Sequence, residues 1–504
     1  MTPRRYLVGL VLLLFATTAL ADVKLPALFS DHTVLQQGKP VPVWGGAEPG
    51  EEVTVSFAGQ TQRATADAEG KWKVKLNPLS ASTESREMTV QGKNTLTVKD
   101  VLVGEVWVGS GQSNMQMSVG GVMNVEQEIA AADYPTLRMI TVPNTIAIEP
   151  QTDFKGAWVV CSPETVGRFS AVGYFFAREL WETVQVPVGI IHSSWGGTRI
   201  EPWMDEATFK GDPALKPILD ARETAMENYA KALYDTLGGW FSQAAEAKAA
   251  GRPLPLPPVV SAQDPRRSSQ MASGLYNAMI APLVPYAIQG AIWYQGESNA
   301  GDPAGYRRLF PAMIAGWRQA WGQGDFPFLF VQLASFMGTG AEPRDTNWAR
   351  LREAQTMTLA TPNTGMAVII DIGMPANIHP VNKQDVGKRL ALWAEHMVYG
   401  KDVVYSGPLY DSMKVEEGAI RISFKHAEGG LVAKDGVLKG FAIAGEDGKF
   451  VWAEATIEGQ TVVVKNAQVP QPKAVRYAWD DYPVCNLYNA AGLPASPFRT
   501  DMPE

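Results

Sequence analysis

Four short segments each contain a residue with a group that can take part in acyl transfer. They are Ser113 in "GQSNM", Gly196 in "SSWGG", Asn299 in "WYQGESN" and His379 in "ANIHP". A serine hydroxyl is a weak nucleophile unless a neighbouring imidazole takes its proton. The tetrahedral intermediate also needs hydrogen-bond donors for its negative oxygen, and losing one donor costs about 10²–10³ in rate. These residue types together predict a serine nucleophile, a histidine base and an oxyanion pocket.

Ser113 follows the apolar run "EVWVG" and precedes a segment that we expect to be helical. A strand-to-helix turn exposes a hydroxyl at the edge of a sheet, and Gly109 and Gly111 supply backbone angles that other residues resist. The flank is not GxSxG, because Met115 occupies the second glycine position. A serine in a turn or at a helix N-cap would by itself explain this segment. The interpretation therefore depends on the other three segments.

Those three segments also follow apolar runs. Gly196 and Gly197 come after "VGII", and their backbone N–H groups can face a pocket without side-chain obstruction; Asn299 comes after "GAIW" with an amide that can donate to an oxyanion. His379 comes after "MAVII" and just before an amphipathic segment. Because ligands bind beyond the carboxyl ends of parallel strands, we expect all of these residues at one edge of a sheet.

The choice of base rests on the few histidines in the chain, which stand at positions 32, 192, 379, 396 and 426. His32 and His426 fall in β-like regions and His396 lies deep in a predicted helix, so structural roles are expected for them. His192 is the one rival, since it also ends an apolar run. Packing or a substrate hydrogen bond is the plainer role for His192, and we predict His379 as the base.

The pattern of apolar residues divides the chain after residue 21 into three regions, one of which carries an insertion. Residues 22–100 and 401–504 contain short alternating segments separated by Gly, Pro and Asn, which is typical of β-sandwich-like regions. Residues 101–400 alternate compact apolar runs with helical stretches, which predicts an α/β domain with a mostly parallel sheet covered on both faces. An insertion at about 204–274 breaks this rhythm. The sequence leaves open whether it is a lid or substrate wall, or a solvent-exposed decoration.

Residues 1–21 are predicted to be a secretory signal peptide. Arg4 and Arg5 precede an apolar stretch, which ends in the small-residue site Ala19-Leu20-Ala21. The stretch is short for a membrane span, which needs about 20 residues. We expect cleavage after Ala21, a periplasmic or secreted location, and no membrane association after the signal is removed.

Composition excludes several classes of function. Without residues 1–21 the formal net charge changes from −8 to −10, which argues against a nucleic-acid partner or an anionic membrane surface. There is no CxxC, no HExxH and no acidic calcium loop, so neither a metal nor another cofactor is predicted. Cys161 and Cys485 are interpreted as two isolated thiols, although export would permit a disulfide. The oligomeric state is not readable from the sequence.

The order of these segments along the chain resembles that of a known family. The order "GQSNM", "SSWGGTRIEPW", "WYQGESN", "IHPVNKQDVGKRLA" is similar to that of bacterial sialate O-acetylesterases, a branch of the SGNH hydrolases. The opening "LFSDHTVLQQGKPVPVWG" and the closing "NLYNAAGLPASPFRTD" are similar too, so the resemblance spans nearly the whole chain after residue 21. It implies a three-layer α/β/α domain and an exported esterase that removes O-acetyl groups from carbohydrates through an acetyl-serine intermediate.

The resemblance also implies roles for individual residues. Ser113 would be the nucleophile, its own N–H would join Gly196 and Asn299 in the oxyanion hole, and His379 would be the base. SGNH enzymes carry a triad acid three residues before the histidine, where this chain has Ala376.

Asp371, at the end of "MAVIID", is the best remaining candidate for the acid. Its carboxylate would orient His379, or would instead cap the loop that follows; a Ser–His pair oriented by a backbone carbonyl is the other interpretation. Glu297 and Arg199 are candidates for polar groups in the pocket or for structural ion pairs.

Two alternatives to the acetylesterase remain. One is a carbohydrate-binding protein that keeps the fold without the catalysis, since 15 Trp and 15 Tyr suit sugar stacking. The other is a lipase or thioesterase on the same fold, which would need an apolar acyl channel. The acetylated sugar itself is not readable, because fold similarity does not choose among sialic acid, xylan and xyloglucan.

Overall fold

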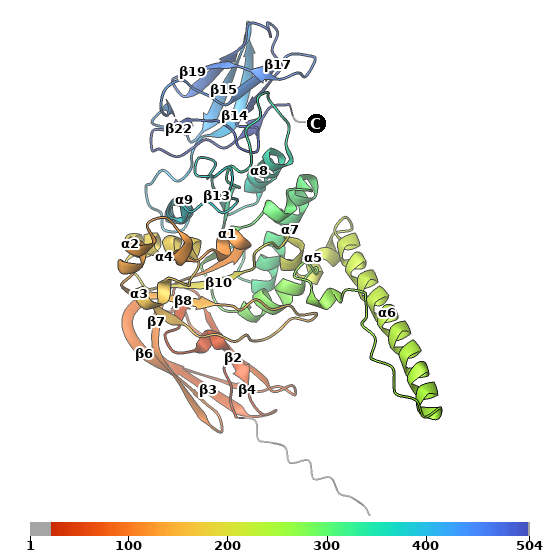
Figure 1. Ribbon diagram of the computed structural model, residues 1–504. Coiled ribbons are helices and arrows are strands. Elements are labelled where there is room, and N and C mark those ends of the chain that lie inside the picture. Colours follow the sequence, from red (N-terminus) through yellow and green to blue (C-terminus); the bar gives the residue numbers. More distant parts are fainter. Residues whose placement is uncertain (1–21, 502–504) are drawn as a thin grey trace, which may run out of the picture.

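A long central strand, β7 (Thr95–Gly111), organises the computed structural model, which describes residues 22–501 (Figure 1). The predicted signal peptide lies outside the described residues. The second half of β7 is buried at every position, as expected for a strand covered on both faces. Its first half belongs to the N-terminal β region, so the expected boundary at residue 100 falls inside one strand, at a point where Asp100 has a φ of 52°.

β7 lies in the middle of the catalytic sheet. The strand order is β13-β12-β11-β7-β10-β8-β9, and every neighbouring pair is parallel except β8 with β9. The other strands of this sheet are β13 (Thr364–Ala367), β12 (Phe328–Val331), β11 (Gly290–Tyr294), β10 (Val188–Ser194), β8 (Tyr134–Thr141) and β9 (Val159–Cys161). β10 and β11 are buried throughout. The predicted α/β class with a mostly parallel sheet is confirmed.

Helices cover both faces of this sheet. On one face Trp107 of β7 contacts Phe176 of α4 (Ala171–Val184), and α4 packs on α9 (Lys383–Met397). On the other face Trp293 of β11 contacts Trp317 of α7 (Pro303–Trp321), which packs beside α8 (Asn347–Met357). Three short helices complete the α/β region: α1 (Ser113–Gln116), α2 (Val125–Ala130) and α3 (Pro163–Val166). This produces the three layers that the resemblance implied.

The N-terminal region is a set of antiparallel strands joined to the catalytic sheet through β7. β3 pairs with β4 and β6, β6 pairs with β7, and β2 pairs with β5; β1 pairs with β7 in parallel. The bounds are β1 (Val34–Gln36), β2 (Val41–Gly46), β3 (Glu52–Phe57), β4 (Gln60–Thr65), β5 (Lys71–Leu76) and β6 (Ser82–Gln91). Valines on alternate positions of β2 and β3 are buried, which is the period of strands with one inward face.

The C-terminal region is antiparallel throughout. One sheet has the order β14-β15-β20-β19, another β18-β17-β21-β23, and β16 pairs with β22. Phe424 of the first sheet contacts Phe498 of the second, so the two sheets share a core. The bounds are β14 (Leu409–Glu416), β15 (Ala419–Lys425), β16 (Leu431–Ala433), β17 (Phe441–Ala444), β18 (Val451–Trp452), β19 (Glu454–Glu458), β20 (Thr461–Lys465), β21 (Ala474–Tyr477), β22 (Leu487–Asn489) and β23 (Phe498–Arg499).

Arg352 of α8 joins this C-terminal region to the catalytic domain. Its fully buried guanidinium donates to the carbonyls of Leu333 and Ala334 and to those of Asp480 and Asp481. A guanidinium offers five donors in a fixed plane, so one side chain can satisfy carbonyls from two domains. The loop after β12 is therefore held against the C-terminal sheets.

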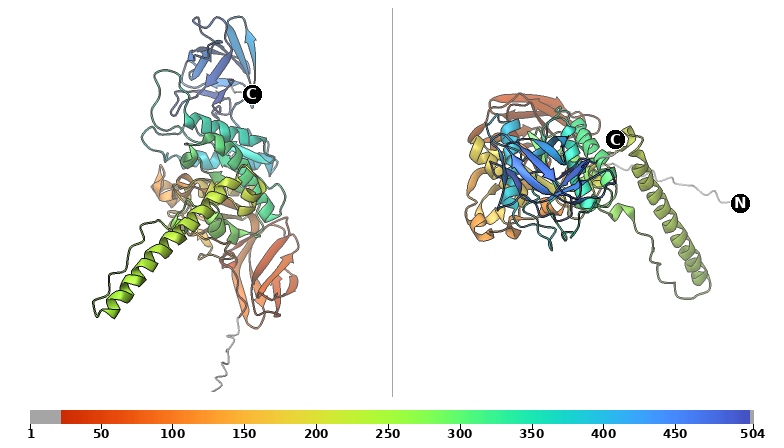
Figure 2. Two further views of the ribbon diagram at one scale, coloured as in Figure 1. Left: turned by 90° about the vertical axis from the view of Figure 1, so that its right-hand side faces the viewer. Right: turned by 90° about the horizontal axis from the view of Figure 1, so that it is seen from above.

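The insertion contains α5 (Glu206–Gly211) and the 34-residue α6 (Lys216–Ala249). α6 projects from the body of the molecule in two perpendicular views (Figures 1 and 2). At 1.5 Å per residue its length is about 51 Å. Only Leu219 and Ala247 are buried along it, so most of this helix faces solvent.

Three further observations concern the described residues, 22–501. Cys161 and Cys485 are both free, in agreement with the interpretation as isolated thiols. No helix in this part of the chain has the length and apolar character of a membrane span. Within the same range, no group of three or more His, Cys, Asp or Glu side chains is arranged to hold a metal ion.

Candidate active site

Ser113 begins α1 immediately after β7, at the carboxyl edge of the sheet. The turn depends on Gly111, which has a φ of +140° and packs against the next strand: a Cβ atom there would lie 2.1 Å from the carbonyl oxygen of Tyr294. A side chain at this position would separate β7 from β11. The strand-to-helix turn predicted for Ser113 is therefore present, and it leaves the hydroxyl half-buried.

His379 meets Ser113 from the loop between β13 and α9. Its Nε2 lies 2.8 Å from the Ser113 Oγ, although the two residues are 266 positions apart in the sequence. The backbone N–H of His379 donates to the side chain of Asn377. Burial, and next the charge of Lys383, lower the pKa of His379. Near neutral pH the imidazole is thus neutral, with a lone pair that can accept the serine proton.

The structure does not bring Asp371 to His379. Both carboxylate oxygens accept hydrogen bonds from Arg389, at 2.6 and 2.8 Å, and the Tyr488 hydroxyl lies 3.4 Å from one of them. No hydrogen bond joins Asp371 to His379 within residues 22–501. The prediction of Asp371 as the orienting acid is corrected accordingly: a bidentate guanidinium on the neighbouring helix α9 holds this carboxylate.

Gly196 does lie against Ser113. A Cβ atom on Gly196 would stand 3.1 Å from the Ser113 Cβ, so the absence of a side chain permits the contact. The Gly196 N–H donates to Oε1 of Gln116, the last residue of α1, at 2.8 Å. Gln116 therefore accepts from the N–H that the sequence analysis assigned to the oxyanion hole. For Gly196 to donate to an oxyanion, the Gln116 carboxamide must first move away from this N–H.

Asn299 is buried, and its side chain is held on several sides. Its Oδ1 accepts from the Ile200 N–H and from Gln295, while its Nδ2 donates to Glu201 at 3.1 Å. In the described chain no hydrogen bond connects Asn299 to Ser113. The structure thus fixes the orientation of the amide and leaves its part in an oxyanion hole a proposal.

A buried polar cluster supports the loop that carries His379. The Asn114 Nδ2 donates to Glu297 Oε1 at 2.5 Å and to the carbonyl of Ile378 at 3.0 Å. Lys383, at the start of α9, donates to Asn114 Oδ1 and to the carbonyl of Pro380, each at 2.7 Å. The cluster therefore holds the carbonyls on either side of His379.

The charges in this cluster are strongly perturbed by burial. Burial raises the pKa of Glu297, and its Oε2 has no hydrogen-bond partner within the described residues. Burial also lowers the pKa of Lys383 to about 7, although the charge of Glu297 opposes this shift. Perturbed groups of this kind gather at functional sites.

The sequence marked Glu297 as a pocket candidate but missed Asn114 and Lys383. The sequence feature that could have pointed to them is their closeness to the reacting residues: Asn114 comes one residue after the serine, and Lys383 comes four residues after the histidine.

His192, the rival base, lies elsewhere. Its Nε2 is 2.6 Å from the Ser194 hydroxyl, it is buried, and burial lowers its pKa to about 4. Its ring also contacts Phe169 edge-on. This is the structural histidine that the sequence favoured, and its neutral ring belongs to the core.

Comparisons with known proteins fit this geometry. A family model described as a sialic acid-specific acetylesterase of the carbohydrate esterases matches residues 236–393. The mouse sialate O-acetylesterase is 32% identical over 97% of this chain and 97% of its own length. The human enzyme is 30% identical over 90% of this chain and 88% of its own. The chain belongs to the sialate O-acetylesterase family.

A solved structure agrees with this membership. The crystal structure of a carbohydrate acetylesterase from Xanthomonas citri superposes with a TM-score of 0.81 at 40% identity, covering 95% of this chain and 100% of that one. Together these relatives establish that the chain is a carboxylic ester hydrolase. The Ser113–His379 pair supplies the two groups that hydrolysis of an ester through a serine nucleophile requires.

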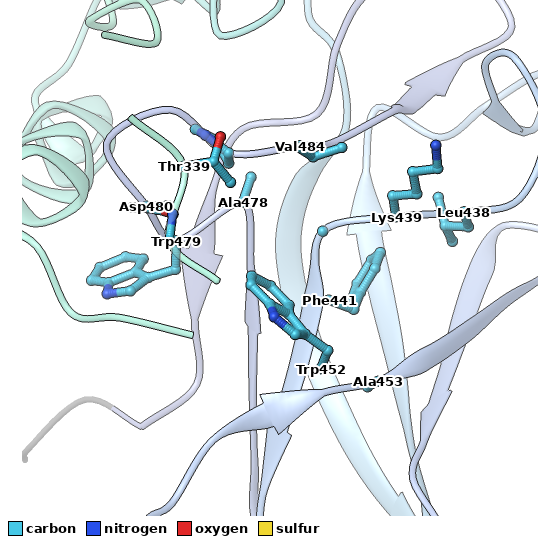
Figure 3. A pocket seen from close by; sticks show the side chains of 13 residues that line it. Thr339, Leu438, Lys439, Phe441, Trp452, Ala453, Ala478, Trp479, Asp480 and Val484 are labelled. Atoms are coloured by element: carbon cyan, nitrogen blue, oxygen red, sulfur yellow. The ribbon is translucent and has the colours of Figure 1, made fainter. Parts of the chain in front are cut away.

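Two of the ligand-sized cavities in the described residues of this esterase bear on where a substrate could bind. One, of about 380 Å³, is formed by the C-terminal sheets and the loop after β12, with Trp452 and Phe441 facing the hollow (Figure 3). In the described chain none of the residues lining it is hydrogen-bonded to Ser113, His379 or Asn299. A second cavity, of about 370 Å³, lies between α6 and the segment after Gly197, beside the catalytic edge.

Proposed function

We propose that this family member is a serine acetylesterase that removes O-acetyl groups from carbohydrates through an acetyl-serine intermediate. The observation that carries the proposal is the 2.8 Å contact between Ser113 Oγ and His379 Nε2. The printed names of the relatives, acetylesterases of sialate and of carbohydrates, support the acetyl group and the sugar as substrate class.

In the first half of the reaction His379 Nε2 takes the proton of Ser113 as Oγ forms a bond to the acetyl carbon. The carbonyl oxygen becomes an oxyanion, which would accept from the N–H of Ser113, from Gly196 after Gln116 withdraws, and from the Asn299 amide. Collapse breaks the bond to the sugar oxygen, and the imidazolium returns its proton to that oxygen. The sugar leaves with a free hydroxyl and the acetyl group stays on Ser113.

In the second half His379 removes a proton from water, and the water oxygen attacks the acetyl-serine carbonyl. Collapse of this second intermediate breaks the bond to Oγ, which regains its proton from His379 and releases acetate. Because Arg389 holds both oxygens of Asp371, the proposal gives this carboxylate no part in orienting the imidazole. The hydrogen bonds of Asn114 and Lys383 to the loop carbonyls provide the orientation instead, so the reaction proceeds from a Ser–His pair in a polar scaffold.

Acetate release by the purified chain beside its Ser113→Ala variant tests the proposal. The panel is O-acetylated sialic acid, acetylated xylan, acetylated xyloglucan and a chromogenic acetate. We expect release that disappears in the variant, together with trapping of an acetyl group on Ser113 by rapid quenching and mass spectrometry. Release that persists in Ser113→Ala would contradict the mechanism. Glycan binding without any turnover would favour the carbohydrate-binding alternative, and preference for long acyl esters would favour a lipase.

The proposal includes export, on the basis of the predicted signal in residues 1–21. Fractionation of cells that produce the full chain, followed by N-terminal sequencing, tests this point. We expect the exported protein to begin at Asp22. Recovery of a chain that still begins at Met1 from the cytoplasm would contradict it.

A further inference from the structure

The cavity of about 370 Å³ beside the catalytic edge, here named the insertion pocket, is lined on one side by the start of α6. Its helical residues are Ile218, Ala221, Arg222 and Ala225, which follow the i, i+3, i+4, i+7 spacing of a single helix face. Met271 lines it from the segment that returns to the α/β core. The volume lies within the range of small-molecule sites, about 300–1,000 Å³.

The opposite wall of the insertion pocket is continuous with the candidate active site. Gln270 accepts from the Arg199 N–H at 3.1 Å and donates to the carbonyl of Gly197 at 2.8 Å. Gly197 follows Gly196, which touches Ser113. Glu201, also in the lining, accepts from the Asn299 amide. A molecule whose acetyl group lies at Ser113 can therefore reach this pocket over the Gly196–Gly197 turn.

The charged side chains of the pocket are already paired within the protein. Arg199 bonds to Glu201 at 2.7 Å. Arg222 bonds to Glu206 at 2.7 Å and also to Glu223, and its side chain is only 8% exposed. The three carboxylates outnumber the two guanidinium groups, so the pocket offers donors and acceptors without an unpaired positive charge. Such a lining suits hydroxyl groups, whereas a carboxylate would have to compete with Glu201 for Arg199.

Taking these observations together, we infer that the insertion pocket binds an uncharged sugar residue of the acetylated carbohydrate. The inference rests on the proposed function and deepens it, because it names a neutral glycan as the substrate class and gives the insertion a role as substrate wall. The hydroxyl groups of the sugar meet Arg199, Glu201 and Gln270, while the apolar face of the ring lies on Met271 and the first turns of α6. The acetylated residue itself lies over Ser113.

The test fills the pocket from α6. Ala225→Trp places an indole in the lining, and Ala230→Trp, at an exposed position on the same helix outside the lining, is the matched control. The substrates are an acetylated xylo-oligosaccharide, O-acetylated sialic acid and a chromogenic acetate. We expect the ratio of kcat/KM for the oligosaccharide to kcat/KM for the chromogenic acetate to fall by about tenfold or more in Ala225→Trp, and to stay constant in Ala230→Trp.

Each other outcome has a defined meaning. A constant ratio in Ala225→Trp, or an equal fall in Ala230→Trp, overturns the inference. Turnover confined to acetylated sialic acid overturns the neutral-sugar assignment and leaves the esterase proposal intact. If the native chain hydrolyses none of the esters, the proposed function fails. Binding of the deacetylated oligosaccharide by calorimetry then decides the pocket: loss in Ala225→Trp supports it, and equal affinity overturns it.

Discussion

Two carboxylates at the same edge of the catalytic sheet have opposite environments. Asp371 follows β13 and is fully paired, since both of its oxygens meet the guanidinium of Arg389, whose Nη1 also donates to the Val368 carbonyl. Glu297 follows β11; one of its oxygens accepts from Asn114, and the other is buried with no hydrogen-bond partner among residues 22–501. The better-paired carboxylate lies away from His379, and the under-paired one belongs to the cluster that holds its loop.

The difference separates an architectural ion pair from a group that serves chemistry. Burying a carboxyl group with one oxygen unpaired costs about 1–3 kcal/mol, and proteins tolerate such costs mainly at functional sites. The Asp371–Arg389 pair stabilises the junction of β13 and α9, with Tyr488 of the C-terminal region beside it. The Glu297 cluster stabilises the orientation of the imidazole. A substitution of Asp371 should therefore change stability, whereas a substitution of Glu297 should change kcat.

The largest fall in kcat should come from a substitution in the Ser113–His379 pair, whose histidine loop the Glu297 cluster holds. His379→Ala removes the group that accepts the serine proton, and we expect kcat to fall by about 10⁴-fold or more, as for members of catalytic triads elsewhere. Chromogenic acetate hydrolysis measures the loss, and circular dichroism checks the fold. His192→Ala is the matched control, because that ring is a core residue whose loss should lower stability. Near-native turnover by a folded His379→Ala variant would remove His379 as the base.

The next effect distinguishes the two carboxylates directly. Glu297→Gln keeps an acceptor for Asn114 but removes the incompletely paired carboxyl group, so we expect kcat to fall by about tenfold with stability unchanged or increased. The KM for the chromogenic acetate should change little, because Glu297 does not face the ester in the proposed mechanism. The kcat and KM values, with urea unfolding, provide the measurement. A loss of stability with normal kcat would make Glu297 architectural as well.

Much of this arrangement was predictable because it depends on local pattern. Apolar runs followed by glycine or a polar residue mark the carboxyl ends of buried strands, so Ser113, Gly196 and His379 could be assigned to one edge. Few histidines compete for the role of base, and His192 was set aside because packing is its plainer role. The β-like alternation at both ends of the chain likewise predicted the flanking regions.

The remaining errors arise where partners come from distant segments. The role of Asp371 depends on Arg389, which lies 18 residues later on a helix, and a carboxylate at a strand end has no local sign of that partner. Asn114 and Lys383 meet only because the sheet brings residues 269 positions apart together. The boundary predicted near residue 100 rests on Lys99 and Asp100, which interrupt the apolar pattern, while the backbone continues through them as β7.

Asp371→Asn should act on stability instead of catalysis. The amide cannot balance the Arg389 charge, and the side chains of both partners are 14% and 11% exposed, so we expect unfolding to become easier by about 2 kcal/mol. Urea denaturation measures the change, and kcat on the chromogenic acetate should stay within about twofold of native. Asp385→Asn, a substitution in the first turn of α9, the helix that carries Arg389, is the control. A selective fall in kcat without loss of stability would restore Asp371 as the orienting acid.

The smallest effect concerns pH. Lys383 is protonated in the acidic range where His379 titrates, because the pKa of Lys383 stays near 7 and that of His379 lies below its ordinary value. The positive charge therefore favours the neutral imidazole that the base requires. Lys383→Gln removes the charge but keeps a donor for Asn114, so the pKa of His379 should rise.

The acidic limb of kcat/KM for the chromogenic acetate should then move to higher pH, and activity below neutrality should fall more than activity above it. Lys388→Gln, an exposed lysine on the same helix, should leave the profile in place. A uniform fall at all pH values would assign Lys383 only to holding the loop. Lys383 would then act through its hydrogen bonds to Asn114 and to the Pro380 carbonyl, and not through its charge. Of the two charged residues that contact Asn114, only Glu297 would remain as an electrostatic contributor to the site.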